Sequence, residues 1–90
     1  MTMQLNSNSL KLSAGFRMQW EPTQDSNVLL YPEGMVRLNE TASEILKKVD
    51  GMRTQSEIIE ELLVEFGDAN IESDVNEFLE EAFSRGWVCV

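Results

Sequence analysis

The segment VLLYPEGMVRL, residues 28–38, decides how the neighbouring sequence folds. Two short apolar runs flank the tetrapeptide Tyr31-Pro32-Glu33-Gly34. Proline fixes φ for the second position of a type I turn, and glycine suits the fourth position. The segment therefore predicts a β-hairpin with strands over 28–31 and 35–38.

A further strand is predicted upstream, over residues 16–20. Apolar and polar residues alternate there with the period of a half-buried strand, so Phe16, Met18 and Trp20 are expected to face the core. Strands that are neighbours in sequence usually pair with each other. We therefore expect a three-stranded antiparallel sheet in sequential order, with 35–38 at one open edge.

Downstream of the hairpin, the apolar period changes to that of a helix. Asn39 or Thr41 can cap the first helix, and Thr54 and Glu57 have the spacing of a capping box for the second. The expected helices span 40–50, 55–66 and 73–85, and a short closing strand covers 87–90. This order predicts an α+β fold of winged helix-turn-helix type, with a three-stranded antiparallel sheet followed by three helices and a short C-terminal strand.

The length of 90 residues fits one domain. Residues 1–14 are rich in Asn and Ser and lack the apolar stretch of a signal peptide. They are expected to form a flexible arm that precedes a single domain over 15–90. No run of about 18 apolar residues occurs, which predicts a cytoplasmic protein without a membrane span.

The negative charge is concentrated in the second part of the chain. Residues 1–53 carry six basic and six acidic residues, whereas the remainder carries ten acidic residues and only Arg85, so the net charge of −9 lies there. Such a surface repels nucleic acid and anionic lipid and favours a basic protein partner, although it also keeps a small protein in solution. The alternative function, a winged-helix DNA-binding regulator, would turn four carboxylates of the third helix towards phosphates.

Few side chains in this sequence are suited to catalysis. There is no histidine, and the one cysteine, Cys89, cannot form an intramolecular disulfide or a paired metal motif. Adjacent carboxylates such as Glu80 and Glu81 point about 100° apart on a helix and do not converge on one site. The chain is therefore expected to bind a protein or peptide, without a cofactor or metal, and not to act as an enzyme.

An exposed strand edge is the candidate for such binding. The strand 35–38 would offer unpaired N–H and C=O groups to an extended peptide. The third helix has a wide apolar face, in which Phe78, Leu79 and Phe83 could serve the core, a groove, or both.

Four strings of residues carry a resemblance to a known family. They are GFRMQWEP at 15–22, VLLYPEGMV at 28–36, LN at 38–39 and VDG at 49–51. In these strings the chain closely resembles the PqqD family, and its last two helices match that family in length and periodicity.

The resemblance implies a peptide chaperone, a recognition element for ribosomally synthesised and post-translationally modified peptides (a RiPP recognition element). The chain would bind the precursor peptide PqqA and present it to the radical S-adenosylmethionine (SAM) enzyme PqqE in the biosynthesis of pyrroloquinoline quinone (PQQ). No cofactor is implied for this chain, because the iron–sulfur clusters belong to the enzyme. A working monomer is expected, with dimers possible in crystals. The acidic second and third helices are either specific to this protein or face the enzyme.

In the wider family, the leader peptide adds as a strand to the third strand and packs against the third helix. Carried over to this sequence, the resemblance implies that the peptide backbone pairs with Met35, Val36, Arg37 and Leu38. The apolar wall would consist of Val75, Phe78, Leu79 and Ala82, and Arg85 would pair with a peptide carboxylate. Leu79→Asp is accordingly expected to weaken peptide binding by more than about tenfold while the fold survives.

Overall fold

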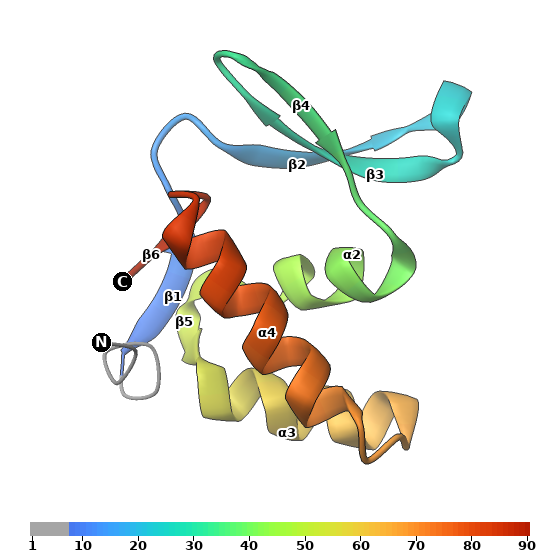
Figure 1. Cartoon of the computed structure of the whole chain (residues 1–90), viewed down its shortest axis with the longest axis vertical. Coiled ribbons are helices and arrows are strands. Elements are labelled where there is room, and N and C mark those ends of the chain that lie inside the picture. The colour runs from blue at the N-terminus through green and yellow to red at the C-terminus, as the bar shows by residue number, and fades with distance from the viewer. Residues whose placement is uncertain (1–7) are drawn as a thin grey trace.

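The computed structural model describes residues 8–90, which form two small antiparallel sheets and three α-helices. Along the chain the elements are β1 (Ser9–Leu12), β2 (Arg17–Glu21), the 3-10 helix η1 (Pro22–Gln24), β3 (Ser26–Tyr31), β4 (Gly34–Arg37), α2 (Glu40–Lys47), β5 (Asp50–Thr54), α3 (Gln55–Phe66), α4 (Ile71–Ser84) and β6 (Val88–Cys89). The sheet β2-β3-β4 forms an upper layer above the helices (Figure 1). The predicted α+β class is therefore confirmed.

The predicted hairpin and the strand before it form the upper sheet in sequential order. Met18, Leu29 and Val36 lie opposite one another across the three strands, so their side chains share one face. Leu29 is fully buried in the main hydrophobic core, which identifies this face as the inner one. Trp20 was also expected to face the core, but it is 52% exposed, because the end of β2 extends beyond the helices (Figure 1).

A second sheet, β5-β1-β6, was not predicted from the sequence. Its central strand is β1, within the segment expected to be a flexible arm. Leu10 of this strand is fully buried, so the arm prediction is wrong for Ser9–Leu12, and residues 1–7 lie outside the described part of the chain. The expected closing strand is present as β6, which pairs with β1.

The helix boundaries follow local capping. Asn39, and not Thr41, caps α2, because its Oδ1 accepts a hydrogen bond of 2.8 Å from the N–H of Ala42. The predicted capping box at Thr54 and Glu57 opens α3. α2 is shorter than expected, because the residues from Asp50 onward pair with β1 as β5. α4 begins at Ile71, two positions before the predicted start.

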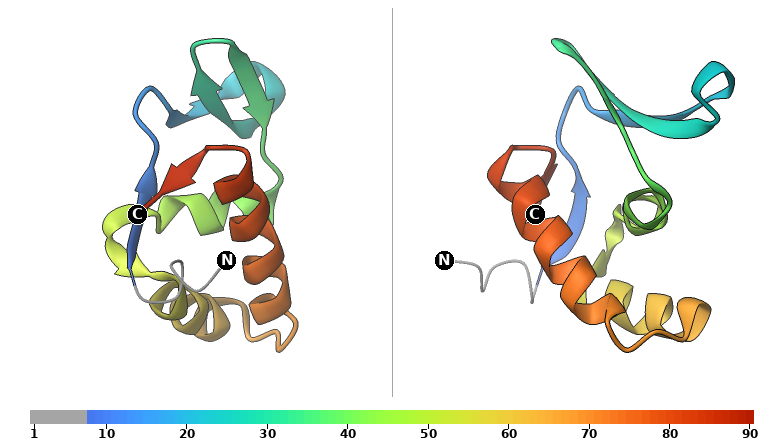
Figure 2. Two further views of the ribbon diagram at one scale, coloured as in Figure 1. Left: turned by 60° about the vertical axis from the view of Figure 1, so that its left-hand side comes forward. Right: turned by 45° about the vertical axis from the view of Figure 1, so that its right-hand side comes forward.

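The core fills the space between the upper sheet, the helices and β1. Figure 2 shows α2 nearly end-on in its right-hand view, between the upper sheet and α3. The predicted helical stripes supply most of the buried side chains, namely Ala42, Ile45, Leu46, Val49, Ile58, Leu62, Val75, Leu79 and Ala82. No helix formed by residues 8–90 combines the length and the apolar character that crossing a membrane requires.

A network of ion pairs joins α2, β5 and α3. Lys48 Nζ lies 3.2 Å from Glu61 Oε1 and 2.7 Å from Glu65 Oε2, and Arg53 Nε lies 2.8 Å from Glu61 Oε2. The hydrogen bond from Arg53, followed by the one from Lys48, lowers the pKa of Glu61 from its ordinary value of 4.5. The hydrogen bond to Glu65 raises the pKa of Lys48.

This network is expected to stabilise the fold at neutral pH and to lose that contribution in acid. Since the pKa of Glu61 is lower in the folded chain than in the unfolded chain, its contribution is present above the unfolded pKa and is lost as pH falls through the folded pKa. The unfolding temperature, measured from about pH 7 to about pH 3, should fall more steeply for the wild type than for Glu61→Gln. Glu60→Gln, which removes an exposed neighbour without an ion pair among residues 8–90, should keep the wild-type slope. Equal slopes for all three proteins would contradict the assignment.

Candidate peptide-binding site

A groove lies between β4, the start of α2 and one face of α4. Its volume is about 680 Å³, which is within the range of ligand-binding clefts. Two parts of the chain that are distant in sequence, residues 36–45 and 74–87, therefore meet at one surface. The residues lining it are Val36, Arg37, Leu38, Asn39, Thr41, Ala42, Ile45, Asp74, Glu77, Phe78, Glu81 and Trp87.

The open edge of β4 runs along this groove. Among the described strands, β4 pairs only with β3, and Leu38 N donates to Asn27 O at 2.9 Å just past its end. Hydrogen-bonded and non-bonded pairs alternate in an antiparallel ladder, so the N–H and C=O groups of Met35 and Arg37 face away from β3. These groups are free to pair with an added strand.

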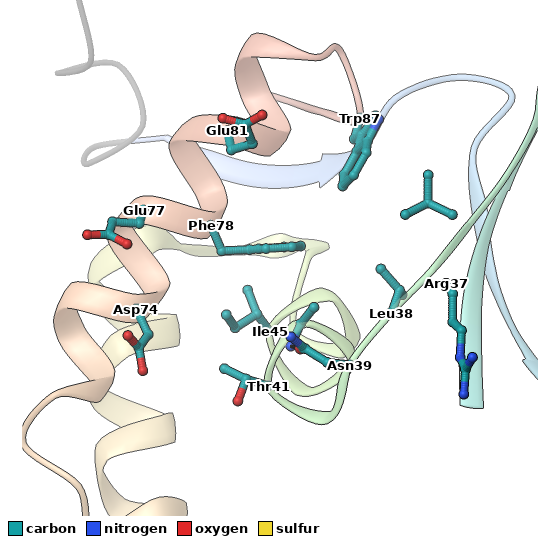
Figure 3. A pocket seen from close by; sticks show the side chains of 12 residues that line it. Arg37, Leu38, Asn39, Thr41, Ile45, Asp74, Glu77, Phe78, Glu81 and Trp87 are labelled. Atoms are coloured by element: carbon teal, nitrogen blue, oxygen red, sulfur yellow. Dashed lines mark hydrogen bonds between the residues drawn. The ribbon is translucent and has the colours of Figure 1, made fainter. Parts of the chain in front are cut away.

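The inner surface of the groove is apolar and aromatic. Figure 3 shows Phe78 pointing from α4 into the space between α4 and Leu38. Its ring lies 6.4 Å from that of Trp87, tilted by 57°, so the two aromatic side chains form a continuous wall. Both are only partly buried and present ring surface to the groove, where side chains of a bound peptide would pack.

The structure separates the side chains predicted for the apolar wall. Phe78 lies at the groove surface, as expected. Val75, Leu79 and Ala82, however, are fully buried in the core and offer no surface to a peptide. They support the helix from beneath, and the expectation that Leu79→Asp would leave the fold intact does not agree with this burial.

Arg85 lies at the far end of α4 and does not line the groove. Its Nε forms an ion pair with Glu81, one turn earlier in the helix. Its guanidinium carbon also lies 5.8 Å from the centre of the Trp87 ring, a cation–π arrangement. Arg85 therefore contacts two residues that line the groove, Glu81 and Trp87, without lining the groove itself.

Some lining residues were not singled out from the sequence. Trp87 was assigned only to the closing strand, although tryptophan is a large amphipathic side chain often found at binding surfaces. Asp74 and Glu77 were read as part of a generally acidic helix, but they share the helix face that borders the groove. Their position could be assigned only once α4 was oriented against β4.

Among residues 8–90, no group of three or more His, Cys, Asp or Glu side chains is placed to hold a metal ion. An open strand edge beside a partly apolar groove is the arrangement by which protein domains bind extended peptides.

Comparisons with known proteins identify similar sequences and one similar structure. The family model "Coenzyme PQQ synthesis protein D (PqqD)" matches residues 26–88. A PqqA binding protein of Acinetobacter baylyi is 52% identical over 77 residues, covering 84% of this chain and 78% of that protein. Another, of Azotobacter vinelandii, is 52% identical over 79 residues and covers 87% and 86% of the two chains.

A solved structure is also similar. It is the solution NMR structure of the PqqD part of Methylobacterium extorquens PqqCD, described as a functional, stand-alone RiPP recognition element. The TM-score is 0.77 with 29% identity, over 94% of this chain and 93% of that one. These relatives are peptide-binding and recognition proteins, which supports the expectation that this chain is not an enzyme. The resemblance drawn from residues 15–51 is thus confirmed, and the chain belongs to the PqqD family.

Proposed function

We propose that this protein binds the precursor peptide PqqA and presents it to the radical SAM enzyme PqqE in PQQ biosynthesis. The observation that carries the proposal is the open edge of β4 beside the groove that contains Phe78. The peptide adds as a strand beside residues 35–38 of this protein, and every second side chain of the peptide enters the groove.

The energetics require both parts of this site. About four backbone hydrogen bonds, from the outward groups of Met35 and Arg37, contribute roughly 0.5–1.5 kcal/mol each. Ordering a disordered peptide costs about 2–5 kcal/mol or more, so the free energy gained from backbone pairing is nearly cancelled by this cost. The surplus comes from apolar side chains that pack against Phe78, Trp87 and the half-buried Val36.

The remaining predicted residues act indirectly in this proposal. Val75, Leu79 and Ala82 fix α4 against the core so that Phe78 keeps its position. Arg85 exchanges its partner Glu81 for a carboxylate of the peptide. In the same proposal, the recognition domain begins with β1. The protein works as a monomer in the cytoplasm and binds neither nucleic acid nor membrane.

A titration of the isotope-labelled protein with PqqA peptide, followed by NMR, tests this proposal. Amide shifts are expected at Met35–Leu38 of the sequence and along the groove face of α4 around Phe78. The exposed Val64 of α3, which does not line the groove, serves as the internal control and should not shift. Shifts centred on α3 would move the site elsewhere, and an unchanged spectrum would contradict peptide binding by the free chain. Adding PqqE to the complex should then broaden further signals if presentation occurs.

A further inference from the structure

The wall of the groove formed by α4 is acidic. Asp74, Glu77 and Glu81 all line the groove and lie three and four positions apart, so they share one face of the helix. They follow one another along α4 on both sides of Phe78 (Figure 3). With a rise of 1.5 Å per residue, the three carboxylates border about 10 Å of the groove.

Two of these carboxylates have no cationic partner. Glu81 is paired with Arg85, but neither Asp74 nor Glu77 forms an ion pair with any residue from 8 to 90. Among the described residues, Arg37 is the one cationic residue that lines the groove. Its Nη2 donates to Gln24 O at 3.4 Å, and its side chain points away from α4 (Figure 3).

The other paired lysine and arginine side chains are held elsewhere. Lys48 and Arg53 belong to the ion-pair network with Glu61, and Lys47 pairs with Glu44 of its own helix. None of these cations is paired with Asp74 or Glu77 at the groove.

In a peptide strand added to β4, every second side chain would face this wall. Successive side chains on that face lie about 6.8 Å apart. Asp74 lies four positions before Phe78, on the same face of the helix, and Glu77 also lines the groove. A lysine or arginine has an apolar stem that can cover the ring of Phe78, while its charged end reaches one of these carboxylates. An acidic side chain at the same position would be repelled.

We infer that the groove selects an extended peptide segment with a lysine or arginine facing Asp74 and Glu77. The inference rests on the proposed function, since it assigns the charge of the ligand to the same groove. Asp74 and Glu77 act as specificity-determining residues, and Phe78 supplies the apolar contact beneath the cation.

The test is a titration of the full chain with PqqA peptide, in which affinity is measured at several salt concentrations. The double variant Asp74→Asn with Glu77→Gln should bind about three- to tenfold more weakly at low salt, since exposed ion pairs are individually weak. Its affinity should also depend less on salt than that of the wild type. Glu80→Gln changes the same charge on the same helix outside this groove, and it should keep wild-type affinity and salt dependence.

The cationic side chain is then located on the peptide. Each lysine or arginine of PqqA is replaced by glutamine in turn, and each peptide is measured with the wild type and with Glu77→Gln. One replacement should weaken binding to the wild type and have little further effect in Glu77→Gln, which identifies the pair.

Different failures have different meanings. Tight binding that neither the double variant nor salt changes would overturn the charge selection and leave the proposed function standing. The same holds if no single replacement in the peptide couples to Glu77→Gln. Absence of binding by the folded wild type would overturn both.

Discussion

Leu79→Asp is expected to unfold this protein. Leu79 is fully buried in the core, on the inner side of α4. Removing a buried leucine side chain costs about 2–5 kcal/mol, and burying an unpaired carboxylate adds several kcal/mol more. The sum reaches the stability of about 5–15 kcal/mol that is typical of a small domain. The circular dichroism spectrum at room temperature should therefore be that of an unfolded chain, and heating should produce no cooperative unfolding transition.

Phe83→Asp provides the matched control for this substitution. Phe83 lies on the same helix and is 38% exposed, so the new carboxylate would reach water. This variant should unfold cooperatively, with a modest decrease in melting temperature. A folded Leu79→Asp protein with weakened peptide binding would show that α4 can turn its apolar side outward, and would contradict the packing described above.

Met35→Pro is expected to lower the affinity for PqqA by more than about tenfold in a chain that stays folded. The N–H of Met35 faces away from β3, so proline removes no bond of the existing sheet. It does remove one donor for the peptide strand, worth about 0.5–1.5 kcal/mol. The proline ring also occupies the position where the added strand must approach, which weakens the neighbouring bonds.

Met35→Ala separates the backbone from the side chain. The side chain of Met35 is 49% exposed, and alanine shortens it while keeping the N–H. Affinity should then stay within about threefold of the wild type. Both variants should melt near the wild-type temperature. Similar losses for alanine and proline would assign the effect to the side chain, and unchanged binding by Met35→Pro would exclude strand addition at β4.

The parts of the fold that depend on local signals were predictable from the sequence. The turn at Tyr31–Gly34 of the sequence, the capping box at Thr54 and the helical stripes are each determined by residues a few positions apart. These local features were sufficient to predict the order of β2, β3 and β4 and the position of the open edge.

The second sheet was not predictable in the same way. β1 is a short strand in an Asn- and Ser-rich segment, and its partner β5 contains Asp50 and Gly51, which are unfavourable in strands. Their pairing joins Ser9 to Thr54, far apart in the chain. No local pattern reports such a pairing, and Asp50-Gly51 was taken for the end of a helix.

The candidate site was predictable to the level of its elements. The strand edge and the helix beside it were both expected, but the apolar period of α4 does not distinguish Phe78 from Leu79. These neighbours differ because the helix is rotated so that Leu79 faces the core and Phe78 faces the groove. That rotation is set by the packing of α4 against α3 and β6, which a single sequence does not display.

The central position of β1 affects how the chain can fold during synthesis. This strand is made before the other described strands, yet its neighbour β6 pairs Val88 with Leu12 and Cys89 with Lys11. At about 5–20 residues per second, roughly 4–15 seconds separate the synthesis of the two strands. During that time part of the packing around Leu10 is missing, and the sheet β5-β1-β6 closes only after Val88 and Cys89 of β6 have been made. A nascent chain halted before β6 would expose apolar residues of β1 to chaperones and proteases.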